Sequence, residues 1–255
     1  MCFDHDSRPP IKPVDGGAVD PKEIELTAAD GNRFAAFVAR AATPTGTGIV
    51  ILPDVRGLHA YYRELAIRFA EYGVDAIAID YFGRTAGIGD RGPGFEYAPH
   101  VGATRYAGLT ADTRAAAAHL RDLTGDSRLF ATGFCMGGRL AFLAPTMGLG
   151  LAGTIGFYGW PAGPARNDTP APADVAAQID CPVLGIFGGA DEGIPASAVA
   201  AFETALTAAN VPHRLTTYEG APHSFFDRKA ADFAEASDRA WAATLGFIGV
   251  GSGVG

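Results

Sequence analysis

Residues 133–138 read Gly-Phe-Cys-Met-Gly-Gly and place the thiol of Cys135 between an apolar run at 129–132 and a helix-compatible run at 139–144. This pattern predicts a strand, a sharp turn and a helix, with Cys135 at the apex. Such a turn needs neighbours without a Cβ atom, and the glycines two residues either side supply them. The helix would direct backbone N–H groups and its positive dipole end at the thiol, stabilising a thiolate and an adjacent oxyanion. The alternative is a buried core cysteine beside glycines that permit close packing.

A nucleophilic thiol that transfers acyl groups requires a base and, usually, a carboxylate that orients the base. Among the six histidines, His223 stands out because it follows an apolar run and precedes the last helical pattern. Asp191 ends the motif Phe-Gly-Gly-Ala-Asp at 187–191, although an aspartate there could instead cap a turn or helix. Cys135, Asp191 and His223 follow one another in the nucleophile, acid, histidine order of α/β-hydrolases. The sequence therefore predicts a Cys-His-Asp triad.

The composition limits the classes of partner. The chain has 255 residues, of which 48% are hydrophobic, and one domain of this size can bury a large core. A formal net charge of −8 argues against nucleic acid or an anionic membrane as a partner, so any positive site must be local. Three cysteines without metal-ligand spacing indicate neither a disulfide framework nor a metal site, and favour a reducing cytoplasm. No secretion signal or spanning apolar run is recognisable.

The elements alternate along most of the chain. Residues 1–20 have the composition of an arm, and the β-rich segments 23–27 and 33–39 flank an Asp-Gly turn, which predicts an antiparallel hairpin. Six apolar strand-like runs follow, at 49–52, 76–79, 129–132, 152–158, 183–187 and 214–218. Helical spacing of apolar residues occurs between or after them, at Tyr62, Leu65, Phe69 and Tyr72, at Val199, Phe202 and Leu206, and at Trp241, Leu245 and Ile248.

This alternation predicts an α/β fold for a single domain over residues 21–248. We expect a mostly parallel central sheet with helices on both faces and the antiparallel hairpin at its edge, and a site at the carboxyl ends of the strands. The Gly- and Pro-rich segment 83–102 is expected to form a lid or pocket wall, or else a variable surface excursion. Residues 249–255 are expected to form a flexible tail.

Five motifs together resemble the dienelactone hydrolase (carboxymethylenebutenolidase) family of α/β-hydrolases, over residues 49–248. They are Leu-Pro-Asp-Val-Arg-Gly at 52–57, Asp-Tyr-Phe-Gly-Arg at 80–84, and the motifs at 133–138, 187–191 and 220–225. The resemblance implies the α/β-hydrolase fold and a Cys-His-Asp triad that opens a lactone or ester.

The resemblance also implies roles for three residues around the thiol. It places one oxyanion-hole N–H at Val55, complementing that of Met136. This agrees with the origin of the second donor in an early strand–helix loop of the fold. Asp54 stands where family members usually carry a glutamate that contacts and helps activate the thiol, so the resemblance implies that Asp54 is the thiol-contacting acid.

Recognition of a substrate carboxylate is expected from arginines. Family members that cleave dienelactone hold its carboxylate with two arginines, one of which Arg84 matches. The other would fall four residues after the histidine, where this chain has Asp227 with Arg228 next to it. Arg56, beside the expected thiol-contacting acid, could supply positive charge instead or be a surface residue.

The expected reaction begins when the Cys135 thiolate attacks an ester or lactone carbonyl, giving a thioester that His223 helps to hydrolyse. No metal or organic cofactor is expected, the expected partner is a small, possibly anionic, ester or lactone, and the chain is expected to be a monomer or small homo-oligomer. Two alternatives stay open: a broad-specificity carboxylesterase or phosphotriesterase using the same triad, and a redox-responsive thiol protein.

Overall fold

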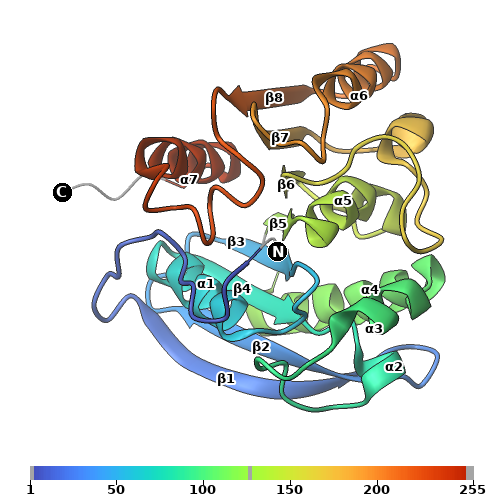
Figure 1. The fold of residues 1–255 in the computed structure, drawn as a ribbon. Coiled ribbons are helices and arrows are strands. Elements are labelled where there is room, and N and C mark those ends of the chain that lie inside the picture. Colours follow the sequence, from blue (N-terminus) through green and yellow to red (C-terminus); the bar gives the residue numbers. More distant parts are fainter. Residues whose placement is uncertain (1–2, 126–127, 251–255) are drawn as a thin grey trace.

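The protein is seen in a computed structural model that describes residues 3–125 and 128–250 (Figure 1). Within these residues one eight-stranded sheet has the order β1-β2-β4-β3-β5-β6-β7-β8. Strand β2 pairs antiparallel with both β1 and β4, and every other neighbouring pair is parallel. The strands are β1 (Ala18–Thr27), β2 (Arg33–Ala41), β3 (Thr47–Leu52), β4 (Val74–Ile79), β5 (Arg128–Phe134), β6 (Gly153–Phe157), β7 (Val183–Gly188) and β8 (His213–Tyr218). The predicted mostly parallel sheet with an antiparallel start is confirmed.

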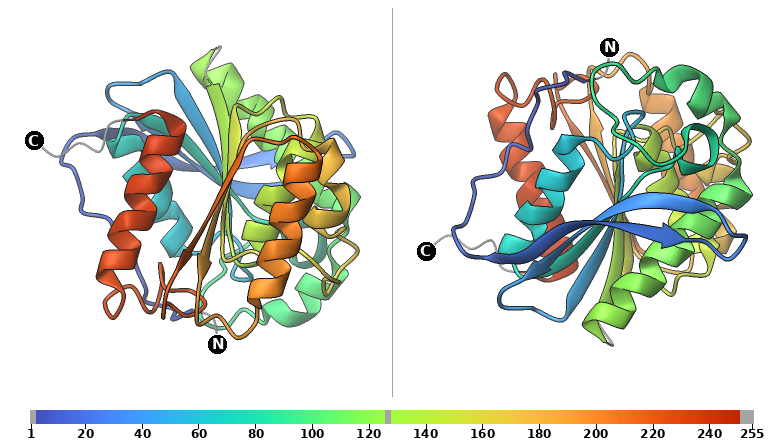
Figure 2. Two further views of the ribbon diagram at one scale, coloured as in Figure 1. Left: turned by 90° about the horizontal axis from the view of Figure 1, so that it is seen from above. Right: turned by 90° about the horizontal axis from the view of Figure 1, so that it is seen from below.

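Helices cover both faces of the sheet, as predicted. The α-helices are α1 (Ala60–Glu71), α2 (Gly83–Ala86), α3 (Tyr97–Ala103), α4 (Tyr106–Thr124), α5 (Met136–Leu143), α6 (Ala196–Ala208) and α7 (Ala234–Ile248), and the 3-10 helices are η1 (Ala144–Met147) and η2 (Pro172–Gln178). Helices α1 and α7 lie on one face, and α4, α5 and α6 lie on the other (Figure 2). In the described part of the chain, no helix is both long enough and apolar enough to cross a membrane.

The central strands are buried on both faces, which explains their continuous apolar runs. Every residue of β3, β4, β6 and β7 is buried. Parallel strands covered by helices on both sides require this composition. Because β3 and β5 to β8 run parallel, their carboxyl ends meet along one edge of the sheet, where the loops carrying Cys135, Asp191 and His223 begin.

The segment 83–102 is not one continuous loop, because it forms α2 and most of α3. A buried ion pair fixes the part between these helices. Arg91, which lies in that part, donates from Nη2 to Asp80, directly after β4, at 2.8 Å. The same guanidinium lies 4.6 Å from the centre of the Phe95 ring, and that ring packs on Phe82 at 5.4 Å between centroids. The segment is thus packed onto the strand end, where it can serve as a wall.

The N-terminal residues lie against the domain. Phe3 and Ile11 are buried, so the described part of the arm packs on the core. Strand β1 begins at Ala18, inside the range expected for the arm, because Ala18 and Val19 pair with the end of β2.

Of the C-terminal tail expected over 249–255, the structure describes only Gly249 and Val250. Val250 is buried, and its N–H donates to the carbonyl oxygen of Leu245. Residues 1–2, 126–127 and 251–255 lie outside the described residues.

Candidate active site

Cys135 sits at a sharp turn between β5 and α5. Its backbone has φ 55° and ψ −113°, a conformation that residues with a side chain rarely adopt. Two hydrogen bonds hold it there: Cys135 N donates to Phe157 O at 3.0 Å, and Arg139 N donates to Cys135 O at 3.2 Å. A strained conformation that surrounding structure enforces is a frequent mark of a functional residue. The side chain is buried but lines a cavity, described below.

The glycines of this turn are required by close backbone contacts. A Cβ atom on Gly133 would lie 1.9 Å from the carbonyl oxygen of Gly137, and one on Gly137 would lie 2.0 Å from that of Leu52. No side chain fits at either position. The sharp turn that the glycine spacing predicts is therefore present, and it brings the start of α5 against the end of β3.

His223 and Asp191 come from the loops after the neighbouring strands β8 and β7. His223 Nδ1 lies 2.6 Å from Asp191 Oδ2, within hydrogen-bond distance. The other carboxylate oxygen accepts the N–H groups of Gly193 at 2.9 Å and Ile194 at 3.2 Å. Because both oxygens of this buried carboxylate are held, Asp191 fixes the orientation of the imidazole.

Two aromatic rings enclose His223. Its ring centroid lies 5.0 Å from that of Tyr158 and 4.9 Å from that of Trp160. Trp160 Nε1 donates to Gly193 O at 2.9 Å, which ties this ring to the loop of Asp191. Burial raises the pKa of Tyr158 well above its usual value, and the charges of surrounding groups, Asp227 and Asp54 among them, raise it further. Tyr158 thus packs on His223, and the residue before it, Phe157, accepts the N–H of Cys135.

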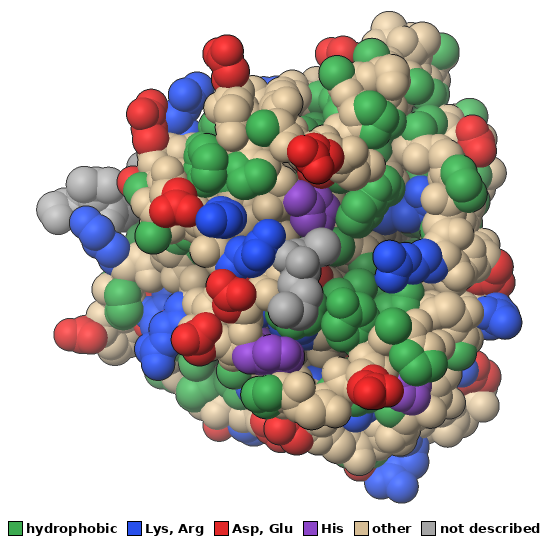
Figure 3. All heavy atoms as spheres, in the orientation of Figure 1, with side chains coloured by type: hydrophobic (Ala, Val, Ile, Leu, Met, Phe, Trp, Pro, Cys, Tyr) green, Lys and Arg blue, Asp and Glu red, His purple; other side chains and the backbone are tan. Residues whose placement is uncertain are grey.

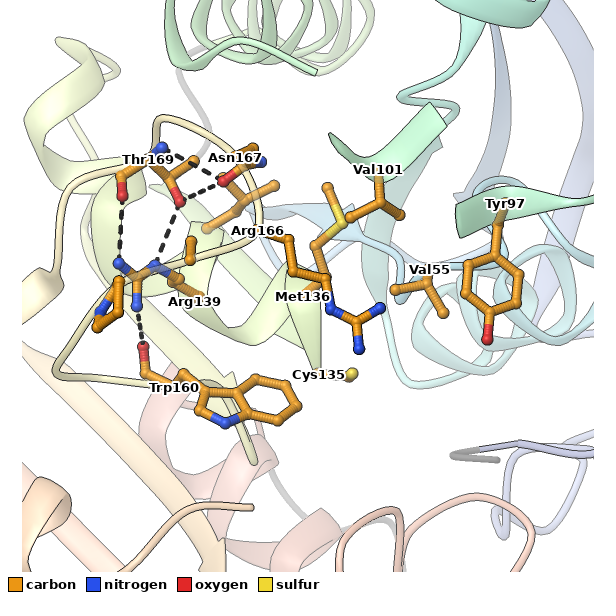
Figure 4. Close-up of a pocket in the computed structure, with 13 residues that line it drawn as sticks. Val55, Tyr97, Val101, Cys135, Met136, Arg139, Trp160, Arg166, Asn167 and Thr169 are labelled. Carbon is orange, nitrogen blue, oxygen red and sulfur yellow. Dashed lines mark hydrogen bonds between the residues drawn. The ribbon is translucent and has the colours of Figure 1, made fainter. Parts of the chain in front are cut away.

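A cavity of about 440 Å³ opens beside Cys135 (Figure 4). This volume lies in the range of small-molecule sites. Its described lining consists mainly of apolar and aromatic side chains, with Val55, Tyr97, Val101, Cys135, Met136, Arg139, Leu140, Trp160, Pro164, Ala165, Arg166, Asn167 and Thr169. In Figure 3, hydrophobic side chains gather near the centre of the drawn face beside a histidine, with basic side chains at their edge.

The cavity links the residues predicted from the sequence. Val55 and Met136, expected to provide the oxyanion hole, line it together with Cys135. Trp160 also lines it and packs on His223, which binds Asp191. The strand ends therefore bring the predicted nucleophile, base and acid to one edge of the sheet.

Asp54 belongs to a buried ion cluster. Arg56 Nε donates to both oxygens of Asp54, at 3.0 and 3.1 Å, and Arg56 Nη2 binds Asp227. Arg56 Nη1 donates to Asp4 O and Ser7 Oγ of the arm, each at 3.1 Å. Burial raises the pKa of Asp227 to about 6, against the opposing effect of the Arg56 charge. The cluster joins the loop of Val55 to the loop that follows His223.

The arginines predicted to bind a substrate carboxylate lie elsewhere, and none of them is among the described residues that line the cavity. The guanidinium of Arg56 is buried between Asp54 and Asp227. Arg84 forms ion pairs with Asp30 at 2.6 Å and Asp112 at 2.8 Å.

Arg228 is exposed and borders a separate surface hollow between the arm and the segment before α7. The positions of Arg56, Arg84 and Arg228 thus give no support to the substrate-binding role expected of them.

Two arginines and a tryptophan of the cavity were not predicted from the sequence: Arg139, Arg166 and Trp160. Arg139 lies one helical turn after Cys135, a spacing that could have identified it. Trp160 and Arg166 follow β6, and the rule that sites form at the carboxyl ends of parallel strands points to that segment. Its Gly- and Pro-containing sequence gives no periodic signal that would place individual side chains.

Comparison with known proteins gives consistent matches. The dienelactone hydrolase family matches residues 34–250. A carboxymethylenebutenolidase of Rhodococcus opacus is 32% identical over 190 residues, covering 72% of this chain and 73% of that protein. A Salmonella typhimurium protein provisionally assigned the same activity is 30% identical over 208 residues, covering 76% of this chain and 74% of that protein.

Solved structures share the fold. A Klebsiella pneumoniae protein, provisionally assigned as a dienelactone hydrolase, has a TM-score of 0.77 and 29% identity, covering 91% of this chain and 99% of its own. A dienelactone hydrolase-like promiscuous phosphotriesterase from metagenomic libraries has a TM-score of 0.69 and 22% identity, covering 91% and 98% of the two chains. The latter likeness concerns the fold alone.

Proposed function

The chain belongs to the dienelactone hydrolase family, and from this premise we propose that it hydrolyses a lactone or carboxylic ester with Cys135 as the nucleophile. The observation that carries the proposal is the positive φ of Cys135 at a glycine-bounded turn that opens on a cavity. The ring of Trp160 in the same cavity packs on His223, which in turn binds Asp191.

The first step is attack of the Cys135 thiolate on the carbonyl carbon, which forms a C–S bond and moves the carbonyl electrons onto oxygen. Cys135 is the residue before α5, so the first N–H groups of that helix and its dipole face the developing oxyanion. The N–H groups of Met136 and Val55 are the proposed donors. Both residues line the cavity with the thiol.

Collapse of the tetrahedral intermediate breaks the bond to the leaving oxygen and leaves a thioester on Cys135. His223 donates to that oxygen the proton that it took from the Cys135 thiol, and then removes a proton from water, whose oxygen attacks the thioester carbonyl carbon. The C–S bond breaks, the acid is released, and His223 returns the proton to the Cys135 sulfur. Asp191 accepts the Nδ1–H of His223, which leaves Nε2 for these transfers and stabilises the charged imidazole.

Asp54 has a positioning role in this proposal. Its Oδ1 accepts the N–H of Arg56 at 2.8 Å and its carboxylate binds the Arg56 guanidinium, so both residues flanking Val55 are fixed. This supports a constant direction of the Val55 N–H. Direct contact between Asp54 and the thiol, implied by the family resemblance, stays a prediction.

The test uses hydrolysis of a 4-nitrophenyl ester by Cys135→Ala, with Cys181→Ala as the matched control. Cys181 is also buried, and burial raises its pKa to about 12, which makes it a poor nucleophile. We expect kcat/KM to fall about a thousandfold or more in Cys135→Ala and to change less than about threefold in Cys181→Ala. A folded Cys135→Ala protein with the wild-type rate would overturn the proposal.

A further inference from the structure

The cavity beside Cys135 is positively charged within an acidic protein. The formal net charge of the chain is −8, yet the described lining residues of the cavity include two arginines and neither aspartate nor glutamate. A concentration of positive charge in a largely apolar cavity attracts an anionic ligand. The two arginines differ in whether their guanidinium groups are available for such a ligand.

The guanidinium of Arg139 forms hydrogen bonds with oxygen atoms of the protein. Its guanidinium donates to the carbonyl oxygens of Trp160 at 3.1 Å, Gly163 at 3.0 Å and Pro170 at 2.9 Å, and to both the carbonyl and the hydroxyl oxygens of Thr169 at 3.2 Å. Burial lowers its pKa to about 10, so the group stays protonated at neutral pH. Arg139 therefore holds the loop over 160–170, and these bonds leave at most one N–H of its guanidinium, on Nη1, for a ligand.

Arg166 lies on the loop that Arg139 holds, and its side chain is exposed. Figure 4 shows its guanidinium pointing into the cavity, on the side where Cys135 lies. Among the residues that the structure describes, no carboxylate lies within 4.0 Å of it and no acceptor forms a hydrogen bond with it. Its donors are therefore available for a ligand.

The backbone that carries Arg166 is anchored directly after it. Asn167 donates to Thr104 Oγ1 at 2.8 Å and accepts from Thr169 Oγ1 at 2.7 Å. Asp168 accepts the N–H of Tyr106, the first residue of α4. These anchors fix the starting point of the side chain, which lowers the entropy lost when the guanidinium binds an anion.

We propose that Arg166 determines specificity by binding a carboxylate on the substrate, so that the preferred substrate is an ester or lactone that also carries a carboxylate. The proposal rests on the proposed function of Cys135. A guanidinium presents paired N–H donors that match the two oxygens of a carboxylate. The apolar body of the substrate would lie against Val55, Tyr97 and Trp160, which line the cavity.

The kinetic test compares two 4-nitrophenyl esters with acyl groups of equal chain length, the anionic glutarate monoester and the neutral valerate. Arg166→Gln is expected to lower the ratio of kcat/KM for the glutarate ester to that for the valerate ester about 10- to 100-fold. Arg166→Lys, which keeps the charge and loses the paired donors, is expected to lie between. Arg214→Gln is the control, because Arg214 is exposed on β8 outside the cavity, and the ratio should not change. An unchanged ratio in Arg166→Gln would overturn the proposal.

An equilibrium measurement separates this proposal from the proposed catalytic function. Calorimetric titration with glutarate needs no turnover, and Arg166→Gln is expected to weaken binding about 10-fold or more relative to the wild-type protein. Equal binding of glutarate by the two proteins, or binding by neither, would overturn the role of Arg166. Failure of the wild-type protein to hydrolyse either ester would instead overturn the role of Cys135.

Discussion

The Nδ1 atom of His223 lies 2.6 Å from Oδ2 of Asp191, and the backbone of Gly193 and Ile194 holds the other oxygen of that carboxylate. The two residues lie 32 positions apart in the sequence, and the parallel pairing of β7 with β8 brings them together. The carboxylate thus has a fixed place, from which it sets the orientation of the imidazole.

Asp191→Asn is expected to remove activity while preserving the fold. The asparagine Oδ1 can still accept the two backbone N–H groups, but its Nδ2 would face His223 Nδ1 and donate to it. Nε2 would then carry the proton and could not act as a base. We expect kcat/KM to fall roughly 10³- to 10⁴-fold with little change in melting temperature. Wild-type turnover by the folded variant would show that the imidazole does not depend on Asp191.

Gly137→Ala is expected to damage both the fold and the site. The added Cβ would lie 2.0 Å from Leu52 O and 2.3 Å from Pro53 O, so α5 or the end of β3 must move. Displacing this strand end also moves Val55. A drop in melting temperature and in esterase activity should occur together, and we expect a loss of several kcal/mol in unfolding free energy.

The matched control is Gly102→Ala in α3. A Cβ atom there meets no atom within 4 Å, and alanine favours the helix by about 0.5–1 kcal/mol. Denaturant unfolding should therefore show unchanged or slightly raised stability. Equal stability of the Gly137→Ala and Gly102→Ala proteins would contradict the packing described for the turn.

Arg56→Met tests the buried ion cluster. Removing the cation leaves Asp54 and Asp227 buried without their shared partner, which is expected to cost about 3–5 kcal/mol of unfolding free energy in urea. Adding Asp227→Asn to Arg56→Met removes one of the uncompensated charges and should recover part of the loss. If Arg56→Met unfolds at the wild-type urea concentration, the cluster does not stabilise the loop.

His59 predicts a specific dependence of stability on pH. Burial, together with the neighbouring Arg56 charge, lowers its pKa from 6.5 to about 4, and its Nδ1 accepts the N–H of Tyr61 at the start of α1. Between pH 6.5 and 4, His59 is protonated in the unfolded chain but stays neutral in the folded protein. The titration of His59 therefore lowers the free energy of unfolding as the pH falls from 6.5 to 4 and adds no pH dependence above pH 6.5.

His59→Asn keeps a helix-capping acceptor and removes the titration. Its melting temperature should fall less than that of the wild-type protein from pH 6.5 to pH 4. The raised pKa of Asp227 has the opposite sign, because it favours the folded state as pH falls through about 6, but it acts in both proteins and cancels in the comparison. Parallel curves of melting temperature against pH would contradict the buried, neutral state of His59.

The architecture, and the placement of Cys135, Asp191 and His223 directly after strands, could be predicted from the sequence because both depend on local patterns. Fully buried parallel strands show as apolar runs, and the contacts that exclude a Cβ at Gly133 and Gly137 leave glycine as the residue that fits. The loops after β7 and β8 begin directly at strand ends, so the motifs of Asp191 and His223 could be placed at one edge of the sheet.

The arginine assignments depended on long-range contacts and could not be predicted in this way. Whether an arginine faces a substrate or a carboxylate is decided by residues far along the chain: Arg84 pairs with Asp30 and Asp112, and Arg56 with Asp227. Arg166 lies in a loop without periodicity, positioned by side-chain hydrogen bonds rather than by a regular element.

The central claim, that Cys135 forms a thioester with the acyl group of the substrate, is tested most directly by mass spectrometry of the acylated protein. His223→Ala should slow hydrolysis of the thioester, so brief exposure to 4-nitrophenyl valerate is predicted to add one valeryl group to the peptide that contains Cys135. The same treatment of a Cys135→Ala, His223→Ala protein should add none. Absence of the adduct on Cys135 in a protein that still releases nitrophenol, or an equal adduct in the double variant, would contradict the account.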